Sequence, residues 1–183
     1  MSTPRVRTSR TRAFTLIETL SVIVVLGILG SITATLLIEN VDAFSDASVH
    51  SRIHADGSVT LDRIVRGIRA IDPDPADSDA PYITVAESGR LEWENGKVLE
   101  RTGTTLSIQT DGANLDVLAT DVTAFSLAYF DEDNAALLSG GAVPAADLPT
   151  IRRVSISLTI TRDGRSESLR TRVFIRSMIG DGT

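Results

Sequence analysis

The stretch FTLIETLSVIVVLGILGSITATLLI, residues 14–38, decides how this chain is organised. Its residues 19–38 form a run of 20 without a charged side chain. At a rise of about 1.5 Å per residue, such a helix is long enough to cross a bilayer core of about 30 Å. Residues 14–38 are therefore predicted to form a transmembrane helix.

The residues before this run are basic. Arg5, Arg7, Arg10 and Arg12 lie close together with no acid among them. Because basic residues flanking a spanning helix stay in the cytoplasm, the chain from Glu39 onward is expected to be translocated. Loss of these four arginines would change the formal net charge of the chain from −6 to −10. An acidic chain of this kind is not expected to bind nucleic acid, which needs clustered Lys and Arg.

Glu18 is the one acid inside the apolar segment. A carboxylate costs up to roughly 2.5–3.5 kcal/mol at mid-bilayer, less near an end, and such residues usually have a functional partner. If the chain were cut between Ala13 and Phe14, Glu18 would lie in the first turn of the new helix. The helix dipole there favours an anion by about 0.3–1 kcal/mol, and a new α-amine would lie nearby. An ordinary signal peptide, cut after a sequence such as Ser31-Ile32-Thr33-Ala34, is the alternative, but it does not explain Glu18.

Ala13-Phe14-Thr15-Leu16-Ile17-Glu18, after a short basic leader and before a long apolar helix, resembles the processing motif of type IV prepilins. The resemblance implies that a prepilin peptidase removes the leader, residues 1–13, on the cytoplasmic side and methylates Phe14. It also implies that Glu18 neutralises the N-terminal amine of an adjacent subunit during assembly. Ala13 stands where glycine is usual, and Thr19 stands where leucine is usual. Alanine is small enough for the same peptidase pocket.

The helix is predicted to continue beyond the apolar run, as an amphipathic segment over residues 39–71. Its apolar residues are spaced to form one stripe along a helix: Leu61, Ile64, Val65, Ile68 and Ile71. Asp72-Pro73 is expected to end it, because proline disfavours a helical conformation in the preceding residue. Gly57 is the weakest point of this helix and could mark a bend.

His50 and His54 lie four residues apart on the same predicted helix. Two histidines at this spacing could share a metal ion, but no appropriate third ligand is evident in the sequence around them. They are expected to be ordinary exposed polar residues.

Residues 72–183 are predicted to form an antiparallel β-rich domain. Residues 72–79 alternate aspartate with proline, alanine and serine and are expected to be a solvated, turn-rich linker. Asn95-Gly96 and Asp163-Gly164 are predicted hairpin turns. The expected strands are 82–86, 90–94, 97–101, 105–110, 115–118, 122–130, 152–161 and 168–177. A long helix followed by antiparallel strands gives an α+β fold class of pilin-like layout.

The long connection 131–149 is the second candidate site. Asp131 and Asp133 at its acidic end are candidate ligands for Ca²⁺, which takes oxygen ligands. Alternatively, the loop is a variable surface that contacts a neighbour. No other cofactor and no catalytic residue is expected. With 2 histidines and no cysteine, most nucleophile and acid–base constellations lack a member, so the chain is not expected to be an enzyme.

The segments around Leu61-Asp62-Arg63-Ile64, Phe125-Ser126-Leu127 and Val154-x-Ile156-x-Leu158 resemble J-type minor pseudopilins of type II secretion and W-type minor pilins. The resemblance implies a subunit that helps to initiate or cap a filament together with other minor and major pilins or pseudopilins. It places the chain in the bacterial inner membrane, with a cytoplasmic N-terminus and a periplasmic or extracellular β-rich domain. The alternatives are a β-rich adhesin or binding module on a simple signal anchor, and a secreted domain cut near Ala34.

Overall fold

The computed structural model describes residues 15–94, 96–109 and 114–176 of the 183-residue chain. Internal contacts divide the chain into two compact units, residues 1–46 and 47–183. One helix, α1 (Leu16–Arg69), contributes residues to both units. An N-terminal apolar helix followed by antiparallel sheets confirms the α+β layout predicted from the sequence.

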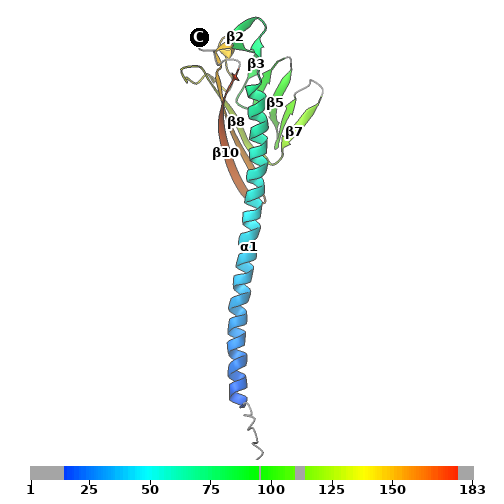
Figure 1. Cartoon of the computed structure of the whole chain (residues 1–183), viewed down its shortest axis with the longest axis vertical. Helices are drawn as coiled ribbons and strands as arrows, with labels where there is room; N and C mark the ends of the chain where they lie inside the picture. Colours follow the sequence, from blue (N-terminus) through cyan, green and yellow to red (C-terminus); the bar gives the residue numbers. More distant parts are fainter. Residues whose placement is uncertain (1–14, 95, 110–113, 177–183) are drawn as a thin grey trace, which may run out of the picture. The chain divides into compact units, whose positions relative to one another are not determined.

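The unit 47–183 contains three antiparallel sheets (Figure 1). Their strands are β1 (Pro73–Asp74), β2 (Asp77–Pro81), β3 (Ile83–Ala86), β4 (Arg90–Trp93), β5 (Lys97–Thr102), β6 (Thr105–Gln109), β7 (Leu115–Ala119), β8 (Val122–Phe130), β9 (Arg153–Arg162) and β10 (Arg165–Phe174). The sheets have the strand orders β1-β2, β3-β4-β5-β6-β7 and β10-β9-β8. A short 3-10 helix, η1 (Leu148–Thr150), precedes β9.

Strands β9 and β10 form the longest hairpin. Successive side chains of a strand point to opposite faces, so every second residue of β9 faces the core. These residues are fully buried: Val154, Ile156, Leu158 and Ile160. Asp163 and Gly164 connect the strands, and both have positive φ (51° and 74°), which a two-residue hairpin turn of the favoured type requires. Arg165 pairs with Arg162 directly after this turn, so β10 begins three residues before the predicted strand.

A bulge at the start of β8 interrupts the alternation of that strand. Strict period-2 alternation would place Val122 and Ala124 on one face and Phe125 on the other. In the structure Val122 pairs with Ile160 and Ala124 with Thr159, so the register shifts between them. Val122 and Phe125 are consequently both buried, while Ala124 is exposed. The extra residue of a bulge accounts for the difference.

Residues 72–79, predicted to be a solvated, turn-rich linker, are mostly exposed but contribute to a short hairpin. Pro73 pairs with Pro81 and Asp74 with Asp77, which makes a short hairpin of β1 and β2. The aspartates hold its turn, because Asp74 Oδ1 accepts a hydrogen bond from the Ala76 N–H at 2.8 Å. A side-chain carboxylate that bonds to the backbone two residues further on stabilises such a turn. Ala80 is buried beneath it.

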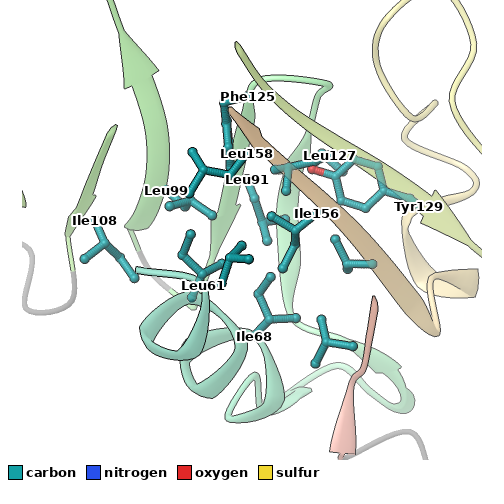
Figure 2. Packing of buried hydrophobic residues seen from close by; sticks show 14 of the residues in the cluster. Leu61, Ile68, Leu91, Leu99, Ile108, Phe125, Leu127, Tyr129, Ile156 and Leu158 are labelled. Carbon is teal, nitrogen blue, oxygen red and sulfur yellow. The ribbon is translucent and has the colours of Figure 1, made fainter. Parts of the chain in front are cut away.

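The core of this unit lies around the second half of α1. Leu61 and Ile68 are buried there, together with side chains from both larger sheets (Figure 2). Ile64 belongs to the same buried cluster. On one side, the Thr60 hydroxyl donates to the Leu118 carbonyl of β7 at 3.1 Å. On the other side, His54 contacts Glu167 of β10. The predicted apolar stripe of the helix is therefore the face that packs between the two sheets.

Tyr129 connects the two larger sheets. It lies in β8, is fully buried, and its hydroxyl is 2.9 Å from the Glu87 carbonyl oxygen and 3.2 Å from the Arg90 carbonyl oxygen beside the β3–β4 turn. Burial, followed by the negative charge of Glu87, raises the pKa of Tyr129 well above its ordinary value. The hydroxyl therefore stays protonated and remains a donor across the ordinary pH range.

α1 continues without interruption through Gly57 and ends at Arg69, two residues before the predicted end. Gly57 is buried. A Cβ atom added at Gly57 would lie 2.6 Å from Leu169 Cδ1 of β10, which is closer than van der Waals contact. At Gly67, by contrast, an added Cβ would lie 3.6 Å from Ile108 Cδ1, an ordinary contact distance. Glycine at position 57 thus allows β10 to approach the helix.

We expect the two glycines to respond differently to alanine. Gly67→Ala should raise the free energy of unfolding by about 0.5–1 kcal/mol, because alanine is the better helix former and space is available. Gly57→Ala should gain less, because the Leu169 side chain has to rotate, and Gly57→Val should lower the free energy of unfolding by about 1–3 kcal/mol through overpacking. Urea-induced unfolding of the three variants tests this. An equal gain from alanine at both positions would contradict the close approach at Gly57.

Candidate functional site

The candidate site is the first part of α1, in the unit 1–46. The helix begins at Leu16, and Thr15 lies directly before it. The Glu18 N–H is 3.0 Å from the Thr15 carbonyl oxygen and 3.4 Å from the Thr15 hydroxyl oxygen. Thr15 therefore acts as the N-cap of α1, and Glu18 occupies the third helical position, where an acid is favoured. Ala13 and Phe14, the predicted cleavage and methylation residues, lie outside the described residues.

The side chains of the described part of this unit are mostly apolar, and all of them are exposed. Every described residue from Thr15 to Asp46 is exposed, including large apolar side chains from Leu16 to Phe44. Among the described residues, one helix is long and apolar enough to cross a membrane, and its most apolar window has a mean hydropathy of 2.4. Membrane anchors and signal sequences share this property when, as here, the helix lies near the N-terminus.

Four hydroxyl side chains of the apolar run bond to the helix backbone. The hydroxyls of Thr19, Ser21, Thr33 and Thr35 each donate to the carbonyl four residues earlier, at 2.8–3.1 Å. All four hydroxyls are therefore hydrogen-bonded within the helix, as a helix in hydrocarbon requires.

The Glu18 carboxylate is different. Within residues 15–94, 96–109 and 114–176 it has no hydrogen-bond or ion-pair partner. It shares one exposed face of the helix with Ser21, Val22, Val25 and Leu26. Nine and twelve residues after Glu18 on α1, an added Cβ at Gly27 or Gly30 would meet nothing within 4 Å. Any ion-pair partner of Glu18 would come from outside the described residues.

The second candidate, at the acidic end of the 131–149 loop, is partly occupied by the protein's own groups. Asp131 Oδ1 accepts a hydrogen bond from the Ala135 N–H at 2.7 Å. Asp131 and Asp133 line a hollow of about 180 Å³ with the cationic Arg152 side chain. In the described parts of the chain, no three His, Cys, Asp or Glu side chains are grouped so as to hold a metal ion as they stand. Calcium binding at this loop stays a prediction.

The sequence reasoning missed two residues that take part in these arrangements. Thr15 could have been recognised, because Thr15-Leu16-Ile17-Glu18 has the spacing of a helix capping box. Glu167, which contacts His54, carried no such signal, since 113 positions separate the two residues in the sequence.

A scan against protein-family models finds no match for this chain, and a search of curated proteins finds none either.

Proposed function

We propose that this chain is a minor pilin- or pseudopilin-type structural subunit that a prepilin peptidase processes and that helps to initiate or cap a type IV pilus-like or type II secretion filament. The observation that carries the proposal is Glu18, an acid without a partner among the described residues, in the first turn of an exposed apolar helix. A simple membrane anchor has no need of a carboxylate there, and the bilayer penalises one.

In the proposed mechanism, removal of residues 1–13 creates a new α-amine at Phe14, one turn before Glu18. The amine of one subunit and the Glu18 carboxylate of its neighbour then form an ion pair inside a bundle of helices. The pair is strong there because the surroundings are apolar. Each partner also supplies the opposite charge that makes burial of the other tolerable.

Assembly by this route moves the apolar segment from lipid to the surfaces of neighbouring helices. The exchange is feasible because one apolar environment replaces another, so packing decides the outcome. Gly27 and Gly30 favour it, since their lack of side chains lets a second helix approach closely. The β-rich unit 47–183 would then be displayed on the filament, with the other minor and major subunits as its partners.

The new N-terminus tests this proposal directly. When the chain is co-expressed with a prepilin peptidase, we expect the mature protein to begin at Phe14 and to carry one added N-terminal methyl group. Intact-mass measurement and N-terminal sequencing detect both changes.

The matched control for this test is Ala13→Leu, which places a bulky side chain before the cut and should leave the leader attached. A wild-type protein that retains its arginines, or one that begins near Ala34, would overturn the proposal in favour of a simple anchor or a secreted domain.

A further inference from the structure

His50, His54 and Glu167 lie together on the surface of the unit 47–183. The histidines are one turn apart on α1, and Glu167 projects toward them from β10. Glu167 Oε1 is 2.5 Å from His54 Nδ1, and Glu167 Oε2 is 3.6 Å from His50 Nδ1. Both imidazole rings are more than half exposed, whereas the Glu167 side chain is only 14% exposed. The fold thus places one carboxylate beside the two histidines, although the three side chains are not yet spaced to bind one metal ion.

One oxygen of Glu167 is available for a ligand. Oε2 is buried and has no hydrogen-bond partner among the described residues. His50 Nδ1, 3.6 Å from Oε2, is too far away for a hydrogen bond. A buried carboxylate oxygen without a hydrogen bond is uncommon in folded proteins and requires a physical explanation.

The separation between His50 Nδ1 and Glu167 Oε2 fits a metal ion between them. Two metal–ligand bonds of about 2.0–2.2 Å at a near-tetrahedral angle place their ligand atoms about 3.4–3.6 Å apart. The observed distance of 3.6 Å between His50 Nδ1 and Glu167 Oε2 lies at the upper end of this range. His54 Nδ1 is too close to Glu167 Oε1 for both to bind the same ion, so its ring has to withdraw by about 1 Å. The exposed position of that ring permits the movement.

We propose that His50, His54 and Glu167 bind one divalent transition metal ion of the zinc type. Two imidazoles and one carboxylate are a ligand set that Zn²⁺ uses, with a fourth position left for water. Mg²⁺ and Ca²⁺ are disfavoured, because they take oxygen ligands. The bound ion fastens α1 to β10 next to the close approach at Gly57. The site is independent of the proposed filament role, because all three residues belong to the unit that begins at Ala47.

Zn²⁺ titration of the full chain in detergent tests the site by isothermal calorimetry. The chain has 2 histidines and no cysteine, so a preparation without a histidine tag has no other imidazole or thiolate ligand. We expect one Zn²⁺ to bind per chain with a micromolar or lower Kd. His50→Ala and Glu167→Gln should each weaken binding at least about tenfold, the size of effect that loss of a ligand or its support produces.

The control is Glu92→Gln, which removes a carboxylate paired with Arg90 in β4 and should leave zinc affinity unchanged. Circular dichroism establishes that each variant is folded, and His50→Ala alters an exposed side chain that the core does not need. Zn²⁺ should also raise the thermal unfolding midpoint of the wild type but not of the two site variants, because it binds only the folded site. Absence of one-to-one binding, or equal affinity in Glu167→Gln, would overturn the proposal.

Discussion

Glu18→Ala should leave the protein made, inserted and processed at Phe14, but should reduce its incorporation into filaments at least about 100-fold. The variant leaves a neighbour's amine unpaired inside the helix bundle. Removing one member of a buried ion pair costs about 3–5 kcal/mol, and each 1.4 kcal/mol corresponds to a factor of about ten. Quantitative immunoblotting of sheared filaments against the membrane fraction measures the ratio of assembled to unassembled subunit.

Two control variants separate the charge of Glu18 from its other effects. Glu39→Ala removes an acid at the far end of the apolar run on the same helix and should leave incorporation unchanged. Thr15→Ala removes the helix cap but keeps the acid, so it should cost only about 1 kcal/mol of helix stability. Glu18→Gln keeps the shape of the side chain without its charge and should fail as Glu18→Ala does. Normal incorporation of Glu18→Gln would contradict the ion-pair role.

The parts of the fold that the sequence predicted correctly have strong local patterns. Val154, Ile156 and Leu158 alternate with serines, and a strand with one buried face has to show that alternation. Asp163 and Gly164 are residue types that adopt positive φ readily, so the sequence itself indicates their hairpin turn. The apolar run from residue 19 to 38 likewise identifies the helix by composition alone.

The features of the fold that were not predicted depend on residues that are close in space but distant in the sequence. The bulge that turns Val122 inward follows from its pairing with Ile160. The β1–β2 hairpin has three prolines, and an aspartate side chain accepts a backbone hydrogen bond in its turn, so its residue types are typical of a loop. From the sequence alone, Gly57 was expected to weaken the helix. The glycine is explained by Leu169 of β10, which lies too close for a larger side chain at position 57.

The two candidate sites differ in the same way. Glu18 could be recognised because a charge inside an apolar run is anomalous wherever the chain folds. The cluster of His50, His54 and Glu167 could not be recognised, since only the packing of β10 against α1 brings the carboxylate to the rings. The processing site at Ala13 and Phe14 and the cation site at Asp131 and Asp133 stay predictions.

Ile156→Ala should have the largest effect on the stability of the β-rich unit. Ile156 lies in the central strand of the β10-β9-β8 sheet, is fully buried, and belongs to the cluster around Leu61 and Ile68 of α1 (Figure 2). Replacement by alanine removes buried methyl and methylene groups and leaves a cavity, which costs about 2–5 kcal/mol. A domain of this size has a free energy of unfolding of about 5–15 kcal/mol, so the loss is a large share of it.

Urea-induced unfolding measures the effect through Trp93, the one tryptophan of the chain, which is buried in the same cluster. Ile156→Val should cost about 0.5–1.5 kcal/mol, because less volume is lost. Ser157→Ala, the next residue on the opposite face of β9, should change the free energy of unfolding by no more than about 0.5 kcal/mol. A cost at Ile156 no larger than that at Ser157 would contradict the packing of this sheet face against α1.

Because processing would act on residues 13 and 14, Ile156→Ala should still be cut at Phe14 even where its abundance falls.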